Sequence, residues 1–408
     1  MNAGVPGGKL RRLVRINELS LIVAIVVVVA ATAYLDHQHT YLEDPTTSAR
    51  NVLRRTAMLG IFSLGAAVVI IAGGIDLSSG SMIAFSGTIC ASFMVLLAPK
   101  AVADAQPLGL PVIALSILAT LAVGFLVGTL HAWLIGIVGL PPFIATLGTL
   151  VGLRSLARAM CAEVTGAMLN ARSTQIQIFD EQFRYLANNV WIPVTIFLVL
   201  AVAIGLMLSR TVVGRHVYAL GGNEQAARLS GIRTERVKWL AYTIGAMTST
   251  VAGILYIGEQ STADPQTLGV GYELNAIAAA VVGGCSLQGG IGTVPGVVLG
   301  ALFLQTVIDA VAKIIKADAD TYEGLIVGLV LVFAAAFSQF RQRATQTREA
   351  FAGALGSAAI LALGLLAGTL VALLAGRTAG IASAVVVLAA LAGTKFWQRR
   401  RGLETAEV

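Results

Sequence analysis

Apolar segments about as long as a membrane-crossing helix recur along the whole chain. A helix needs about 20 apolar residues to cross a hydrocarbon core. The segments that fit, each bounded by charged residues, Pro or Gly, are 18–36, 56–73, 81–98, 110–138, 142–160, 190–208, 239–258, 273–285, 294–312, 322–340, 353–375 and 379–397. Of these, 273–285 is short for a crossing and 110–138 is long enough to include a bend, so each is a candidate for a tilted, broken or re-entrant helix. No convincing cleavage site follows the first segment, which is expected to remain as a span.

Composition supports the membrane interpretation. Of the 408 residues, 57% are hydrophobic and 12% are charged, against about 25% charged in soluble domains. This composition excludes an ordinary water-soluble enzyme. The fold class predicted is therefore an all-α polytopic membrane protein, and the net charge of +7 is interpreted as basic loops facing a cytoplasm rather than as a nucleic-acid site.

The distribution of basic residues predicts an orientation. With a cytoplasmic N-terminus, 17 of the 28 Lys and Arg lie in segments on the cytoplasmic side: Lys9, Arg11, Arg12, Arg15, Arg210, Arg215, Arg228, Arg233, Arg236, Lys238, Arg341, Arg343, Arg348, Lys395, Arg399, Arg400 and Arg401. This excess places both termini inside. Arg50, Arg54 and Arg55 then lie outside, where they are interpreted as snorkelling at the membrane interface. The outer stretch 161–189 is either a small surface element or a plain connector.

Motifs of soluble enzyme chemistry are missing. The chain has no GxxxxGK[ST] phosphate loop and no HExxH, and its cysteines and histidines are not spaced as metal ligands. No catalytic site and no cofactor are therefore expected in this chain. His131, late in an apolar segment, is interpreted as a hydrogen-bonded structural residue in preference to a pathway residue.

The first informative motif is AGGIDLSSGS at 72–81, between two apolar segments. Its glycines permit a break in the helix, and a carboxylate such as Asp76 is costly inside a membrane. Broken helices with a carboxylate are typical of transport pathways, which makes Asp76 and Ser78 pathway candidates. The alternative is an interfacial turn in which these two residues cap the next helix.

The second motif is the basic loop GRHVYALGGNEQAARLSGI at 214–232. Asn223 is expected to cap a short helix that includes residues 224–229, and Gly231 is expected to end it. A short amphipathic helix surrounded by Arg suits docking to a soluble subunit. The alternative is a solvated connecting helix.

The third motif, at 269–293, is rich in small residues, which permit close helix packing in lipid. It contains Asn275 and Ser286, two further pathway candidates chosen for their polarity in an apolar setting. A GGxxLxxG pattern at 283–290 repeats the one at 73–80, which suggests an internal duplication.

Together these motifs resemble those of the membrane-spanning permease of the ribose/xylose/arabinose/galactose class of bacterial ABC importers. The matching stretches are GGIDLSSGS at 73–81, LPPFIATLGTL with Arg154 at 140–154, GNEQAARLSGI with Arg236 and Lys238, and GYELNAIAAAVVGGCSLQGGIGTVPGVVLGA at 271–301. The sequence departs from the class at Ser79, Asn275, Cys285 and His131, where Val, Asp, Thr and Asn are common. The departure at Asn275 removes a charge near the expected pathway.

The resemblance implies an architecture and partners. Residues 18–349 would form a bundle of about ten helices after the basic tail 1–17, and residues 350–408, without a counterpart in the class, are expected to form a two-helix hairpin with a basic tail. Two cytoplasmic ATP-binding cassette ATPases, an extracytoplasmic sugar-binding protein and a second permease, identical or paralogous, would complete an importer in the bacterial inner membrane. The loop residues Arg215, Glu224, Arg228 and Gly231 would then couple the bundle to the ATPase.

Two hypotheses follow from the residues and the resemblance. In the first, the chain is the permease of an importer that moves a monosaccharide into the cytoplasm with ATP hydrolysed by partner subunits. In the second, it is a secondary transporter driven by an ion gradient, for which Asp76 and Asp309 are the candidate coupling residues. The first is preferred.

Overall fold

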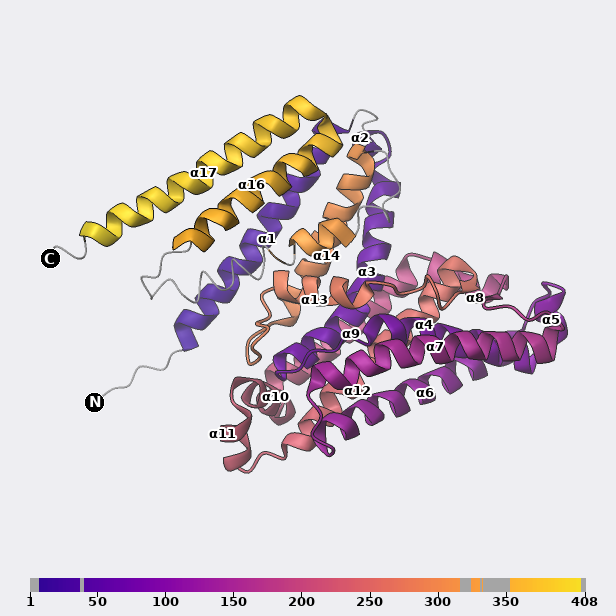
Figure 1. The fold of residues 1–408 in the computed structure, drawn as a ribbon. Helices are drawn as coiled ribbons and strands as arrows, with labels where there is room; N and C mark the ends of the chain where they lie inside the picture. The colour runs from indigo at the N-terminus through magenta and orange to yellow at the C-terminus, as the bar shows by residue number, and fades with distance from the viewer. Residues whose placement is uncertain (1–6, 37–39, 316–323, 331, 333–352, 405–408) are drawn as a thin grey trace. The chain divides into compact units, whose positions relative to one another are not determined.

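The computed structural model describes residues 7–36, 40–315, 324–330, 332 and 353–404, which form two compact units, Met1–Ala335 and Ala336–Val408. Among these residues, nine helices contain stretches long and apolar enough to cross a membrane. They are α1 (Gly7–Leu35), α3 (Pro45–Ile71), α4 (Ser79–Leu97), α6 (Leu110–Gly136), α7 (Pro142–Leu169), α9 (Trp191–Arg210), α12 (Thr234–Gln260), α14 (Val294–Ile315) and α17 (Arg377–Glu404). The predicted all-α polytopic membrane fold is thus confirmed (Figure 1).

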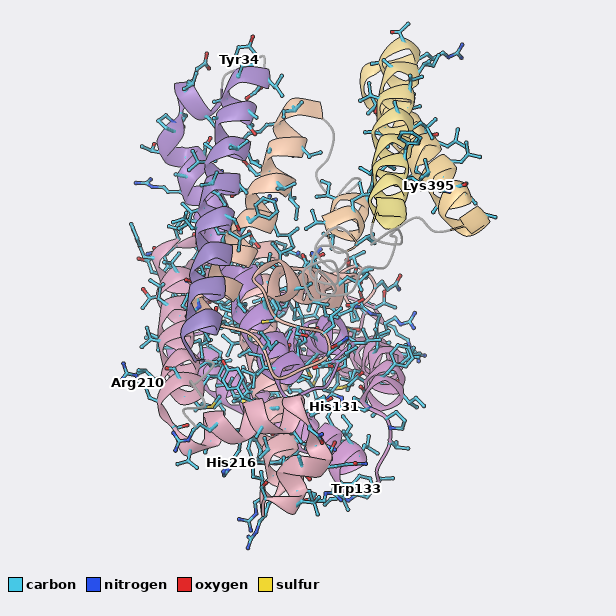
Figure 2. The ribbon with its side chains drawn as sticks, turned by 90° about the vertical axis from the view of Figure 1, so that its left-hand side faces the viewer. Tyr34, His131, Trp133, Arg210, His216 and Lys395 are labelled. Carbon is cyan, nitrogen blue, oxygen red and sulfur yellow. The ribbon has the colours of Figure 1, made fainter. Side chains whose placement is uncertain are left out.

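Shorter elements connect these helices. They are α2 (Thr40–Glu43), α5 (Pro99–Ala103), α8 (Glu181–Asn188), α10 (Val212–Gly222), α11 (Glu224–Leu229), α13 (Tyr272–Val282), β1 (Ile176–Gln177) and β2 (Thr262–Ala263). Arg210, Trp133 and His216 gather towards one end of the first unit, and Tyr34 lies at the other (Figure 2). The part that carries Arg210, α10, α11 and the start of α12 is called the α10 end below.

Helix α12 lies at the centre of the first unit and contacts α3, α4 and α6. Lipid offers apolar surface everywhere, so helices in a membrane associate mainly through close packing, which small residues permit. Gly253 of α12 illustrates the closeness, because a Cβ there would lie 2.5 Å from the Ile83 carbonyl oxygen of α4 and would overlap the Ser86 hydroxyl. Residues 56–71 of α3 and most of α4 are buried as a result.

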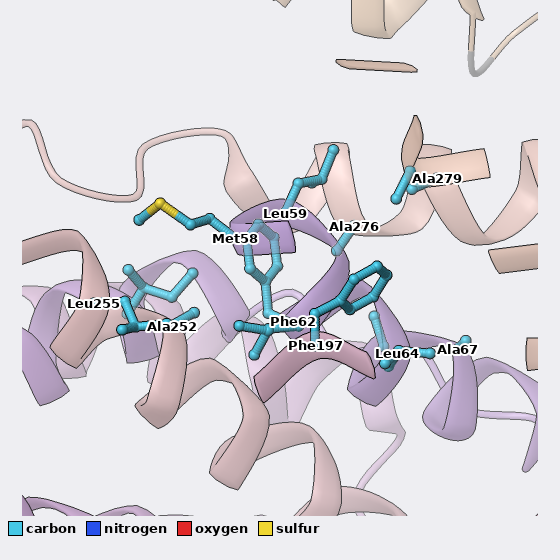
Figure 3. Packing of buried hydrophobic residues seen from close by; sticks show 14 of the residues in the cluster. Met58, Leu59, Phe62, Leu64, Ala67, Phe197, Ala252, Leu255, Ala276 and Ala279 are labelled. Atoms are coloured by element: carbon cyan, nitrogen blue, oxygen red, sulfur yellow. The ribbon is translucent and has the colours of Figure 1, made fainter. Parts of the chain in front are cut away.

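An aromatic and aliphatic core fills the space between α3, α9, α12 and α13. Phe62 of α3 lies beside Phe197 of α9, between Ala252 and Leu255 of α12 and Ala276 of α13 (Figure 3). All five side chains are buried.

The predicted segments are mostly recovered, with two informative outcomes. Residues 110–136 form one continuous helix, α6, without a break. The short segment predicted at 273–285 is the 11-residue α13, which is too short to cross a membrane and is followed by a loop. Segment 322–340 lies mostly outside the described residues, as does the predicted boundary at 349/350.

The stretch 161–189 is a structured element rather than a plain connector. Its first residues continue α7, residues 176–177 pair antiparallel with residues 262–263, and α8 follows. Asp180 caps α8 by accepting a 2.8 Å hydrogen bond from the Phe183 amide. Phe183 and Ala187 then pack against Gly258 near the end of α12.

The second unit contains the hairpin expected from residues 350–408. Helix α16 (Gly353–Ala375) turns at Gly376, whose φ is +90°, into α17. The two helices approach closely at Gly380, where a Cβ would lie 2.6 Å from the Gly368 carbonyl oxygen. The predicted two-helix hairpin is therefore present.

Replacing Gly253 with Ala is expected to destabilise the first unit by about 1–3 kcal/mol, because the new methyl group meets the α4 backbone. The matched control is Gly152→Ala on α7, where a Cβ meets nothing within 4 Å. Thermal unfolding in detergent, followed by the loss of monodisperse protein, measures both. Equal melting temperatures for the two variants would contradict the packing described.

Candidate functional site

Two buried helices end in the same way at the α10 end. After α3, Gly73 adopts a φ of +84° and the Gly74 amide donates a 2.9 Å hydrogen bond to the Val69 carbonyl oxygen. After α13, Gly284 adopts a φ of +93° and the Cys285 amide makes the equivalent 2.9 Å hydrogen bond to the carbonyl five residues earlier. Both are Schellman endings, in which a left-handed glycine turns the chain away from the helix axis.

This likeness corrects the register of the repeat predicted from the sequence. The GGxxLxxG pattern aligns Gly73 with Gly283, whereas the left-handed position after α13 is Gly284. Gly283 is still right-handed and corresponds to Ala72 after α3. The two helix ends share a backbone conformation, but the GGxxLxxG pattern aligns them with a shift of one residue.

The two helix ends meet each other and α10 in close contacts between backbone atoms. The Gly290 amide, in the loop after α13, donates a 2.9 Å hydrogen bond to the carbonyl oxygen of Ile71, the last residue of α3. Gly221, in the last turn of α10, lies against this bond: a Cβ there would overlap the Ile71 oxygen and lie 2.6 Å from the Gly290 nitrogen. A Cβ on Gly289 would lie 2.8 Å from Gly73 Cα. We call Ile71, Gly73, Gly221, Gly289 and Gly290 the glycine junction.

A side chain of α10 adds a polar contact beside the glycine junction. The Tyr218 hydroxyl donates a 2.8 Å hydrogen bond to the Gly292 carbonyl oxygen. Burial raises the pKa of Tyr218 above its ordinary value, so the hydroxyl keeps its proton for this bond. Helix α10 is therefore attached to the loop 283–293 by backbone packing and by one hydrogen bond.

Asp76 and Ser78 lie in the loop between α3 and α4 and contact each other. Asp76 Oδ1 accepts hydrogen bonds from the Ser78 amide (2.8 Å) and from the Ser78 hydroxyl (2.6 Å). Both side chains are buried. Ser78 occupies the cap position of α4 without a side-chain capping bond, so the cap expected in the interfacial alternative is wrong for Ser78; Asp76 instead stabilises its own turn.

The second oxygen of Asp76 faces the helices around it. Oδ2 lies 3.5 Å from the Cβ position of Gly245 in α12. On α6, fully buried His131 places Nε2 2.7 Å from Thr149 Oγ1 of α7, as the structural interpretation of this histidine expects. The His131 ring lies 6.4 Å from the ring of Tyr242, whose buried hydroxyl has no hydrogen-bond partner among the described residues.

Asn275 and Ser286 lie on either side of the second helix end. Asn275 is buried in the first turn of α13, and its backbone N–H donates a hydrogen bond to the Gly271 carbonyl oxygen at 3.2 Å. Ser286 lies in the tight turn after α13, where its amide donates to the Ile291 carbonyl oxygen at 2.9 Å. With Asp76 and Ser78, they make four buried polar residues, two in the loop after α3 and two at the ends of α13.

The predicted coupling helix forms as expected. Asn223 caps α11 by accepting a 2.9 Å hydrogen bond from the Ala226 amide, and Gly231 follows the helix with a φ of +83°. Glu224 forms ion pairs with Lys238 of α12 at 2.7 Å and with Arg228 of its own helix at 3.4 Å. Arg228 also lies 3.5 Å from Glu235, so an ion-pair network holds α11 against α12.

Arg215 and Gly231 are placed differently from the two paired residues. Arg215 is exposed on α10, and no ion pair joins it to another residue in the described part of the chain. Gly231 is exposed, and a Cβ there meets nothing within 4 Å. Its contribution is the left-handed turn, which glycine adopts without strain.

Basic residues within helices have partners that sequence alone did not reveal. Arg154 of α7 donates to the carbonyl oxygens of Pro265 (2.6 Å) and Leu268 (2.9 Å), which holds the loop that leads into α13. Arg54 pairs with Glu259 at 3.2 Å. Arg54 therefore has a specific partner on α12, and its snorkelling stays a prediction.

Asp309, the second candidate for ion coupling, is engaged in a contact between helices. It accepts a 2.6 Å hydrogen bond from the Tyr41 hydroxyl and lies 3.2 Å from Lys313 Nζ. Lys313 also lies 3.8 Å above the Tyr41 ring and 3.0 Å from Ser48 Oγ. Burial, and then the bond to Asp309, raises the pKa of Tyr41. These contacts fasten α14 to α2 and α3.

The sequence matches a family model described as "Branched-chain amino acid transport system / permease component" over residues 48–335. The chain belongs to this permease family. It is 36% identical to the ribose import permease protein RbsC of Escherichia coli K12 over 260 residues, which cover 62% of this chain and 74% of that protein. No solved structure matches the chain.

Two further relatives extend the comparison. Over 325 residues the chain is 30% identical to the autoinducer 2 import system permease protein LsrC of Photorhabdus luminescens, covering 78% of this chain and 89% of that protein. Over 346 residues it is 31% identical to the xylose transport system permease protein XylH of Haemophilus influenzae, covering 70% of this chain and 88% of that protein. The resemblance to permeases of bacterial sugar ABC importers is confirmed, and the chain is a multi-pass membrane protein of that class.

Sequence reasoning missed the residues that join the predicted groups. Gly221 and Tyr218 were part of the second motif, but the motif assigned no role to them. The available signal was the Gly-Gly pair at 221–222, which matches pairs at 73–74 and 289–290. That these three pairs meet is a property of the fold, and no spacing along the chain indicates it.

Asp309→Ala and Lys313→Ala are each expected to lower the melting temperature of the protein in detergent, because either change leaves the other charge partly buried without its partner. The double variant is expected to lose less than the sum of the single losses, with a coupling of about 0.5–3 kcal/mol. The exposed pair Glu163–Arg172 is the control, where Glu163→Ala is expected to change little. Strict additivity at Asp309 and Lys313 would contradict the contact described.

Proposed function

We propose that this chain is the membrane-spanning permease of an ATP-driven importer that moves a monosaccharide, a pentose or hexose such as ribose or xylose, into the cytoplasm. ATP is bound and hydrolysed by a cytoplasmic ATPase, and sugar is delivered by an extracytoplasmic binding protein. The chain itself has no catalytic role. It pairs with a second copy or a paralogous permease.

The observation that carries this proposal is the α11 ion-pair network on the α10 end of a polytopic bundle. The motif at 222–232 folds into a short capped helix, fixed to α12 through Glu224, Arg228 and Lys238. The segment around it carries Arg210, Arg215, Arg228, Arg233, Arg236 and Lys238, and such basic loops favour the cytoplasmic side. A rigid helix on that side suits the attachment of a soluble subunit.

Sugar import is supported by the relatives, whose names specify ribose, xylose and galactose, while the description of the family model specifies branched-chain amino acids. The sugar importers are matched over most of their own length, so we assign a sugar. Asp76, Ser78, Asn275 and Ser286 are proposed to adjust the helix breaks beside the pathway. In the conformation described, all four are buried, so they act by shaping the breaks.

The alternative, a secondary transporter, finds little support in its candidate residues. Asp309 is held by Tyr41 and Lys313, and Asp76 by its own turn. An ion-coupling carboxylate has to exchange its ion during transport, which these contacts oppose. Membership of the permease family favours the importer as well.

The proposal is tested by purifying the tagged protein from its native host in mild detergent and reconstituting what co-purifies. We expect a soluble chain with a phosphate-binding loop in near-equal amount, and uptake of radiolabelled ribose, xylose or galactose that requires enclosed ATP. If the proposal is wrong, the permease is recovered without such a chain. Uptake that persists without ATP and stops with an ionophore would then establish the secondary transporter.

Arg228→Ala is expected to reduce ATP-driven uptake about tenfold without unfolding the bundle, because α11 loses its ion pair with Glu235 of α12 and its internal pair with Glu224. Arg172→Ala, which breaks an exposed pair far along the chain from α11, serves as the control. Uptake per reconstituted complex measures the effect, and melting temperature in detergent checks the bundle. Full uptake by Arg228→Ala would argue against a coupling role for α11.

A further inference from the structure

At the glycine junction the α10–α11 segment meets both helix ends. The Gly290 amide and the Ile71 carbonyl oxygen join the loop after α13 to the end of α3 at 2.9 Å. Gly221 of α10 lies against both of these atoms, with no side chain between them. Tyr218, one helical turn earlier, holds the Gly292 carbonyl oxygen at 2.8 Å.

We propose that Gly221 and Tyr218 are positioning residues for transport, which fix α10 to the ends of α3 and α13 so that a movement of α10 displaces both ends together. The inference deepens the proposed function and rests on it, because an ATPase has to move α10. It assigns the transmission step to specific backbone contacts, which lie apart from the charged residues of α11. Neither residue needs to touch sugar or ATP.

Backbone contact suits transmission for a physical reason. A long side chain between two elements has several rotatable bonds and absorbs a small displacement, whereas packed backbones in contact move together. The Gly290–Ile71 hydrogen bond links the two helix ends, and Gly221 packs against both the donor and the acceptor of that bond. A shift of less than 1 Å in α10 therefore reaches two elements at once, as in other packed two-state interfaces.

A displacement of the two helix ends would reach the turns that carry the pathway candidates. The end of α3 leads directly into the turn of Asp76, which lies beside α6 and α12. The end of α13 leads into the turn of Ser286 and, through the short helix itself, to Asn275. Both breaks that carry the pathway candidates are thus attached to the same two residues of α10.

Gly222 provides a matched control within the same helical turn. It is exposed, and a Cβ there meets nothing within 4 Å, whereas a Cβ on Gly221 overlaps the Ile71 carbonyl oxygen. Each Gly→Ala change raises helix propensity by the same amount, about 1 kcal/mol. A difference between the two variants therefore reports the contact at Gly221 rather than the stability of α10.

The experiment uses the complete importer in proteoliposomes, with permease, ATPase and binding protein, and with whichever of ribose, xylose and galactose the wild-type complex takes up. Accumulated sugar and released phosphate are measured together, and their ratio reports coupling. Gly221→Ala is expected to assemble and hydrolyse ATP while the ratio falls about tenfold, within the range of typical coupling between sites. Gly222→Ala is expected to keep the wild-type ratio, and Tyr218→Phe is expected to lower it by a smaller factor.

A purely structural role would reduce the amount of assembled complex and leave the ratio unchanged, so an unchanged ratio in Gly221→Ala overturns the inference. If Gly221→Ala does not assemble, Tyr218→Phe decides, since it removes one hydroxyl and keeps the shape of the side chain: a lowered ratio supports the inference and a wild-type ratio overturns it. A wild-type complex without ATP-driven uptake contradicts the proposed function itself. Wild-type uptake combined with an unaffected ratio in the variants overturns only the present inference.

Discussion

Contact between backbones at glycine is the constraint on which the packing of the first unit depends. In lipid, apolar side chains gain little by leaving one apolar neighbour for another, so helices gain stability by approaching closely. Helix α12 does this along its length. Its Gly245 packs against α3 and its Gly253 against α4. On α6, Gly128 packs against Thr243 and Gly124 against Thr250 of α12. The glycine junction repeats the same contact where helices end, and there it includes the short helix α10.

Buried hydroxyl groups are a weaker guide to function in this protein than their positions in apolar segments suggest. Ser63, Thr88, Thr120 and Thr250 each donate to a carbonyl oxygen one turn earlier in their own helices, at 2.7–2.9 Å. Such bonds satisfy the hydroxyl without any ligand. Asp76 differs because it is a carboxylate, and because one of its oxygens faces α12 beyond its own turn.

Local features of the fold were predictable from the sequence. Hydrophobic length identifies the spans, the cap at Asn223 and the turn at Gly231 bracket α11, and two apolar blocks separated by Gly376 form the hairpin. Each depends on residues that are neighbours in the chain. The length of the apolar segment 273–285 also indicated that it is short for a crossing, and α13 has only 11 residues.

Contacts between distant segments were not predictable in the same way. The carbonyl oxygens that bind Arg154 lie more than 100 residues along the chain, and the Tyr41–Asp309 contact joins residues 268 positions apart. The alignment of the repeat by residue type was one residue out of register. The structural correspondence depends on which glycine is left-handed, and after α13 that is Gly284. Four candidates chosen for polarity were thus located, but the glycines that connect them to α10 required the three-dimensional arrangement.

The most direct measurement is hydrogen exchange at the Gly290 amide, in the purified protein in detergent, for the wild type and for Gly221→Ala and Gly222→Ala. If the glycine junction joins the two helix ends, this amide is protected in the wild type and in Gly222→Ala, because the Ile71 carbonyl oxygen holds it at 2.9 Å. Gly221→Ala is expected to lose that protection, since the added methyl group displaces the Ile71 oxygen. Rapid exchange in the wild type, or equal protection in all three proteins, would contradict the account.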